Sequence, residues 1–154
     1  MSANRLQLAL GCGIVLLSIF ECIQAYPHLP DPMASNFGGD GIPGGWSSKK
    51  SYMIIYTAST AFWLGALLAA PFLAARARQN FDDATRRSLR DTVGWFLLAS
   101  LAFSAVLTHW VLEANLETGR LSGAFVWLLA VYLSYMAWWT VRLVPRVRRA
   151  DLRG

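Results

Sequence analysis

The residues of this sequence that could do chemistry lie close to the ends of long apolar stretches. His109 and Glu113 are four residues apart and would share one face of a helix. Glu21 lies near the end of another apolar stretch. Further ionisable residues follow it in the next segment: His28, Asp31 and Asp40. Two imidazoles and several carboxylates in one layer could bind a divalent metal ion or a cationic ligand.

The alternative is that these polar groups are structural. Glu21 and Glu113 would then reach water at the membrane interface, and His109 would form a hydrogen bond inside the helical bundle. The sequence contains no compact metal-binding motif such as HExxH. We favour the structural interpretation and keep Glu21, His109 and Glu113 as the candidates for a metal site.

Other kinds of chemistry have less support in the sequence. Haem held by two histidines needs both at one depth of a bundle, but His28 lies outside the apolar stretches. Nucleophile elbows, phosphate-binding loops and zinc motifs are absent. The centres of the apolar stretches also lack the carboxylates and arginines that pumps and transporters carry there. We therefore expect no cofactor, no metal and no enzymatic activity.

Membrane-spanning helices must position these residues. The chain has 154 residues, of which 55% are hydrophobic and 15% are charged, whereas soluble domains carry about 25% charged residues. Four stretches are almost free of charge and long enough to cross a hydrocarbon core of about 30 Å. They are residues 6–25, 52–75, 93–112 and 121–141. Because they lack the alternation of barrel strands, residues 1–154 are predicted to form one all-α domain, an integral membrane four-helix bundle.

The basic residues predict how the bundle is oriented. Lys49, Lys50 and Arg120 flank one end of the predicted helices, and the other 11 of the 14 basic residues lie at the opposite end. Those are Arg5, Arg76, Arg78, Arg86, Arg87, Arg90, Arg142, Arg146, Arg148, Arg149 and Arg153. The positive-inside rule therefore places the N-terminus and the C-terminus in the cytoplasm. We expect the basic flanks to contact membrane lipids with anionic headgroups, and not nucleic acid.

The predicted outer loop, residues 26–50, has an unusual composition. It holds four of the six prolines and five of the twelve glycines, together with Phe37 and Trp46. Aromatic side chains set among proline and glycine turns indicate an ordered loop, which we expect to fold back over the outer face of the bundle. The second outer connection, residues 113–120, is predicted to be only a tight turn. The third helix is predicted to begin near Asp82, which could pair with Arg86.

Small residues at four-residue spacing predict two faces for helix packing. One is the Ala61 face, formed by Ala61, Gly65 and Ala69, and the other is the Ser100 face, formed by Ser100, Ser104 and Thr108. Such faces let helices approach closely where lipid provides no hydrophobic drive. They therefore indicate contacts between helices, either within the chain or with a partner.

From Tyr26 to Lys49 the outer loop has the sequence YPHLPDPMASNFGGDGIPGGWSSK. This string resembles the N-terminal module of the SdpI-type family of bacterial membrane proteins, whose pattern is close to YPxLPxxIPxHFxxxGxPDxWxSK. The resemblance extends from Leu6 to Tyr56. Asn36 stands where the family has histidine, and Gly44 stands where it has aspartate. The resemblance thus implies a similar loop shape and the bacterial inner (cytoplasmic) membrane, without a ligand role for these two positions.

Two functional hypotheses follow. The first is a non-catalytic accessory or structural subunit that packs against a larger membrane complex. Phe37, Trp46, Lys49 and the Ala61 face would then be its partner-binding residues. The alternative comes from the resemblance, because the name-giving SdpI-type members look like immunity proteins that protect a cell against a secreted toxic peptide. A stand-alone immunity or sensing protein would bind such a peptide through its outer loop.

Overall fold

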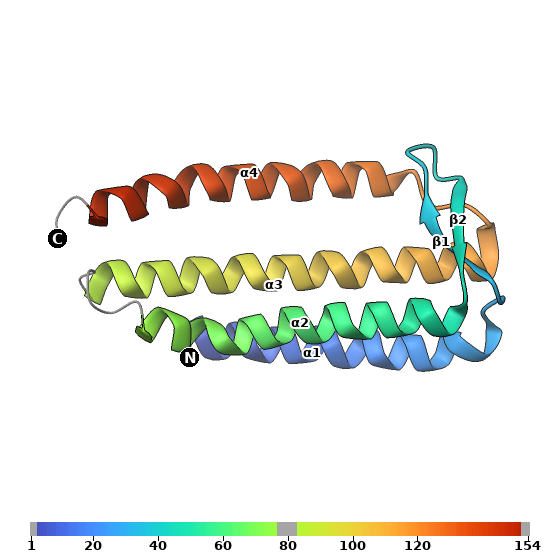
Figure 1. The fold of residues 1–154 in the computed structure, drawn as a ribbon, viewed down its shortest axis with the longest axis horizontal. Helices are drawn as coiled ribbons and strands as arrows, with labels where there is room; N and C mark the ends of the chain where they lie inside the picture. Colours follow the sequence, from blue (N-terminus) through green and yellow to red (C-terminus); the bar gives the residue numbers. More distant parts are fainter. Residues whose placement is uncertain (1–2, 77–82, 152–154) are drawn as a thin grey trace.

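Four long helices and a β-hairpin form the computed structural model, which describes residues 3–76 and 83–151 (Figure 1). The helices are α1 (Ala3–Ala25), α2 (Lys49–Arg76), α3 (Asp83–Glu113) and α4 (Ala124–Asp151). All four are long and apolar enough to cross a membrane. The prediction of an all-α, four-helix membrane bundle is confirmed, and the chain is a multi-pass membrane protein.

The helices differ from the predicted stretches mainly by extending into polar flanks. An apolar stretch marks only the part of a helix that lies in the hydrocarbon core of the membrane. The backbone hydrogen bonds of the helix continue beyond that part. Helix α3 accordingly begins at Asp83, close to the predicted start, while Asp82 and its predicted pair with Arg86 lie outside the described residues. Helix α4 starts three residues later than predicted because the backbone N–H of Leu121 donates to the Gly41 carbonyl at 2.9 Å.

Helix α3 is the centre of the bundle. It packs against α1 and α2 on one side and carries α4 on the other (Figure 1). Leu67 of α2 and Leu101 of α3 are each 1% exposed, and they lie against Gly11 of α1. Near the end of the bundle where α1 begins, the buried Gln7 side chain donates to the Asp91 carbonyl at 3.1 Å.

Helix α4 is attached to α3 by a few aromatic contacts. The Tyr132 hydroxyl lies 3.0 Å from the Ser100 hydroxyl, and the Tyr132 ring stacks on Phe103 with 4.1 Å between centroids. Further along, the Trp139 indole N–H donates to the Thr92 carbonyl at 3.2 Å. None of the 18-residue apolar window of α4 is buried, so this helix presents most of its surface outward.

The predicted outer loop contains a β-hairpin. A short 3₁₀ turn, η1 (Tyr26–His28), leads to strand β1 (Met33–Phe37), which pairs antiparallel with β2 (Pro43–Ser47). The sequence predicts order here but not strands, because its prolines and glycines obscure any alternation of apolar and polar residues. The hairpin covers one end of the bundle, which we call the hairpin end; the start of α1 and the end of α4 lie at the other (Figure 1).

The second connection holds the hairpin in place. Where a tight turn is predicted, the chain forms a π-helical turn, η2 (Ala114–Thr118). The Asn115 side chain on this turn accepts the Ala34 N–H at 2.7 Å and donates to the Ala34 carbonyl at 2.9 Å. It also donates to the Val111 carbonyl at 2.8 Å. The prediction that the loop folds back over the bundle is therefore confirmed.

A hydrophobic core forms beneath the hairpin. Met33 of β1 is fully buried, and around it lie other buried apolar residues from α1, α3 and the two connections. These are Ala25, Leu29, Val111, Leu112, Ala114 and Leu121. At the tip of the hairpin, Gly41 has a φ of +76°, which favours glycine. A Cβ there would also lie 2.5 Å from the Leu121 carbonyl oxygen, so the tip packs directly on the α3–α4 connection.

Replacing Asn115 with alanine tests whether this amide holds the hairpin. The variant leaves the N–H and C=O of the buried Ala34 without partners, at a cost of about 1–3 kcal/mol for each group. We expect a lower thermal unfolding midpoint in detergent and faster proteolysis within residues 30–48. Glu117→Ala is the control, because Glu117 is exposed on the same turn. Equal stability of the two variants would contradict this role.

Candidate functional site

A cavity of about 310 Å³ lies beneath the hairpin, between β1, α2, α3 and the start of α4. Its volume is at the lower end of the range typical of ligand-binding pockets, about 300–1,000 Å³. Polar side chains in its lining are Ser35, Asn36, Tyr52, Ser59, Ser104 and Thr108. The remaining lining residues are apolar or aromatic: Phe37, Ile55, Tyr56, Leu107, Val111, Leu121 and Phe125.

Each wall of the cavity follows from the local fold. Strand β1 contributes Phe37 from above, because the Asn115 amide fixes the strand over the helix ends. Helix α3 contributes Ser104 and Thr108, which are four residues apart on the Ser100 face. Helix α2 contributes Tyr52 and Ser59 to another wall.

The chemistry available in this cavity is that of neutral hydroxyl and amide groups. None of the described residues that line it is charged. Neutral groups of this kind donate to and accept from a peptide backbone or another uncharged polar group. General acid–base catalysis instead uses a titratable side chain positioned at the reacting group. The cavity is therefore suited to binding, and its lining supplies no candidate general acid or base other than tyrosine.

The structure brings together two of the three candidate metal residues. Nδ1 of His109 on α3 and Oε1 of Glu21 on α1 form a hydrogen-bonded ion pair when the imidazole is protonated. Their side chains are 54% and 36% exposed. The Glu113 side chain forms no hydrogen bond or ion pair with the described residues, and no group of three or more potential ligands that could hold a metal occurs among them. The pair thus links α1 to α3 near the hairpin end.

The carboxylates predicted in the outer loop act as backbone acceptors. Asp31 Oδ1 accepts the N–H of Lys49 at 3.3 Å, at the first turn of α2 where a negative charge is favourable. Asp40 Oδ1 accepts the N–H of Ile42 at 3.1 Å inside the hairpin turn. His28 is exposed in η1. These residues shape the hairpin and do not join the Glu21–His109 pair.

The predicted partner-binding residues occupy different environments. Phe37 is half-buried and faces the cavity and the core beneath the hairpin. The Lys49 ammonium lies 3.5 Å from the Leu29 carbonyl and 5.0 Å from the centre of the Tyr26 ring, so its contacts are within the chain. Trp46, by contrast, is 62% exposed on β2. Of Phe37, Trp46 and Lys49, only Trp46 presents a large apolar surface outward.

Sequence reasoning missed the most important residue of this region. Asn115 fell in a stretch predicted as a tight turn, where an asparagine is an ordinary turn former. The sequence did contain a signal for this role. Asn115 has a carboxamide side chain just past the end of an apolar stretch, and the backbone of the long outer loop needed hydrogen-bond partners. The polar residues Tyr52, Ser59 and Asn36 were missed as a group because two separate elements, α2 and β1, supply them.

Comparison with protein families gives one match. Residues 13–59 match the family described as a domain of unknown function, DUF1648. The match extends from Gly13 in α1, through the whole hairpin, to the third turn of α2, and it leaves α3 and α4 outside. Comparison with curated proteins and with solved structures gave no match.

A double-mutant cycle on Glu21 and His109 tests whether their pair is structural. Glu21→Gln, His109→Gln and the double variant should show a coupling free energy of at most about 1 kcal/mol, because solvent reaches both side chains, which are 36% and 54% exposed. Thermal unfolding in detergent gives the comparison, and Glu113→Gln serves as the control. Stoichiometric metal in the purified protein that His109→Gln removes would instead establish a metal site.

Proposed function

We propose that this chain is a non-catalytic subunit that packs laterally against a larger complex in the bacterial inner membrane. In this proposal both termini lie in the cytoplasm and the hairpin lies outside. The distribution of basic residues supports that orientation. The resemblance of residues 6–56 to SdpI-type proteins supports the bacterial membrane.

The observation that carries the proposal is that one of the two small-residue faces is buried within the bundle, whereas the other is exposed. The Ser100 face is internal, with Ser100 1% and Thr108 4% exposed. On the Ala61 face, Ala61 and Gly65 are exposed, and a Cβ added to Gly65 would meet nothing within 4 Å. Small residues on a membrane helix allow a close backbone approach, which only a neighbouring helix exploits. The Ala61 face therefore suits a helix from another chain.

The exposed surface of α4 supports the same proposal. Trp127 is 76% exposed, and Val131 and Val141 are 66% and 71% exposed. With α4 held mainly through Tyr132 and Trp139, the bundle has two broad apolar faces on opposite sides of α3. A subunit that sits between neighbours uses such faces, whereas the neutral cavity lining offers little for catalysis.

Blocking the Ala61 face tests the proposal. Gly65→Leu places a large side chain where a partner helix would approach, while Gly13→Leu does the same at a glycine of α1 that is equally free of neighbours. We expect wild type and Gly13→Leu to co-purify with a stoichiometric membrane protein in mild detergent, identified by mass spectrometry. Gly65→Leu should lose it. A wild-type protein that elutes alone, or a Gly65→Leu variant that keeps the partner, would contradict the proposal.

A second candidate function is an immunity or sensing protein that binds a peptide through the hairpin. Trp46 favours this candidate, because an exposed tryptophan on an ordered strand is a typical hot spot for binding. The neutral cavity beneath the hairpin would offer hydroxyl groups to a peptide backbone. In this function the chain would act alone.

Trp46→Ala tests this second candidate. Cells that express the wild-type chain should survive exposure to a secreted toxic peptide, and the variant should lose protection at equal expression. Trp127→Ala, which removes an exposed tryptophan from α4, is the matched control and should protect fully. Undiminished protection by Trp46→Ala would exclude the hairpin as the binding surface.

A further inference from the structure

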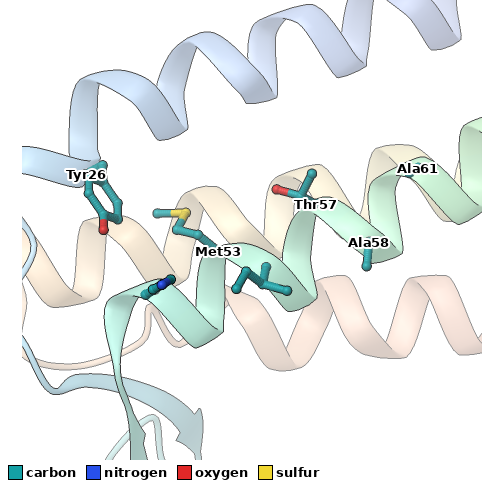
Figure 2. Close-up of a pocket in the computed structure, with 7 residues that line it drawn as sticks. Tyr26, Met53, Thr57, Ala58 and Ala61 are labelled. Atoms are coloured by element: carbon teal, nitrogen blue, oxygen red, sulfur yellow. The ribbon is translucent and has the colours of Figure 1, made fainter.

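A groove runs between α1 and α2 at the hairpin end of the bundle. Two adjacent hollows, of about 480 and 570 Å³, make up this space, and Tyr26, Met53, Thr57 and Ala61 line both of them. Figure 2 shows the first hollow, with Met53, Thr57 and Ala61 following one another along α2 and Tyr26 beside the first turn of that helix. We call this space the α1/α2 groove.

The walls of the α1/α2 groove are apolar and open to the surroundings of the bundle. Helix α1 contributes Ile19 and Ile23, which are 47% and 67% exposed, and α2 contributes Ile54, which is 59% exposed. In a membrane protein such a groove faces hydrocarbon, so its natural occupant is an acyl chain. The groove ends at Leu64 and therefore leaves Gly65 and Ala69 free.

A positive charge lies at the mouth of the groove. Lys50 lines the smaller of the two hollows and is exposed, and its side chain forms no hydrogen bond or ion pair with the described residues. The neighbouring Lys49 differs, because its ammonium already contacts Leu29 and Tyr26. A lysine at the end of a membrane helix lies at the level of lipid headgroups and attracts their phosphates.

Below Lys50 the groove offers a hydroxyl group. Thr57 is exposed, lines both hollows, and has no partner among the described residues. It lies seven residues from Lys50, about 10 Å along the helix axis. The groove thus presents a cation, a hydroxyl group and an apolar channel in that order. These groups complement, in the same order, the phosphate, the ester oxygens and the acyl chain of a phospholipid.

We propose that the α1/α2 groove binds an anionic phospholipid, with its phosphate on Lys50 and one acyl chain extending past Met53 and Ala61. The charge at the mouth favours a lipid over a purely apolar partner helix, which would leave Lys50 without a counter-charge. The proposal does not depend on the subunit function. At Ala61, however, the bound acyl chain would reach the edge of the Ala61 face, where the partner subunit is proposed to bind.

Native mass spectrometry with phosphatidylglycerol tests the site. Loss of one lysine contact near the headgroups weakens binding by about five-fold, so Lys50→Gln should retain phosphatidylglycerol about five-fold less well than wild type. Arg120→Gln removes one positive charge beside Leu121, which contacts the hairpin, in a connection that contributes no residue to the groove, and it should bind like wild type. Phosphatidylcholine, which has no net charge, should be retained less well than phosphatidylglycerol by wild type.

A second variant tests the part of the groove that would bind the acyl chain, without changing any charge. Ala58 lines the groove and is exposed, so Ala58→Trp should fill it without disturbing the interior and should lower retention of phosphatidylglycerol. Equal retention by wild type and Lys50→Gln would overturn the proposal, as would full retention by Ala58→Trp. Displacement of the lipid by inorganic phosphate alone would show a simple anion site and would also overturn it.

Discussion

The hairpin end of this bundle depends on one carboxamide. Asn115 accepts from the N–H and donates to the C=O of Ala34, so its side chain takes the place that a third strand would occupy beside β1. Ala34 is 4% exposed, and a buried backbone group without a partner is costly. Because the sheet has only two strands, this side chain satisfies an edge that would otherwise remain unpaired. The core around Met33 and the roof of the cavity both follow from that position.

The same constraint explains how the ionisable residues are used. Lipid offers no hydrogen bonds, so polar groups near the ends of the helices must find partners within the chain or in interfacial water. Asp31 and Asp40 accept backbone N–H groups, Glu21 pairs with His109, and Gln7 joins α1 to α3. The side chains of Lys50 and Glu113 both lack such a contact with the described residues, but only Lys50 lines the α1/α2 groove and carries the positive charge that attracts a lipid phosphate. For this reason the proposed lipid site lies at Lys50 and not at the carboxylates.

The sequence predicted the membrane helices well because charge-free length is a direct physical requirement of crossing a bilayer. The folding back of the outer loop was also predicted, from its prolines, glycines and aromatic residues. The role of Asn115 was not predicted, because it arises from a contact between residues 81 positions apart. The hairpin strands were not predicted because prolines and glycines obscure the alternation of apolar and polar residues. The small-residue faces illustrate the same limit: spacing identified both of them, but only the structure shows that Ser100 faces α4 while Gly65 faces outward.

The contacts of the hairpin also constrain how the chain is made. Ala34 forms hydrogen bonds with Asn115, and Gly41 forms one with Leu121. The segment between α1 and α2 therefore docks on residues that are synthesised much later. After α1 and α2 emerge from the ribosome, the hairpin therefore lacks its contacts with Asn115 and Leu121. It can form them only when α3 has crossed the bilayer and brought Asn115 to the same side. A nascent chain stalled within α3 would carry an undocked hairpin. Biogenesis of this protein thus requires that its hairpin remain undocked in water until α3 and the connection that follows it are in place.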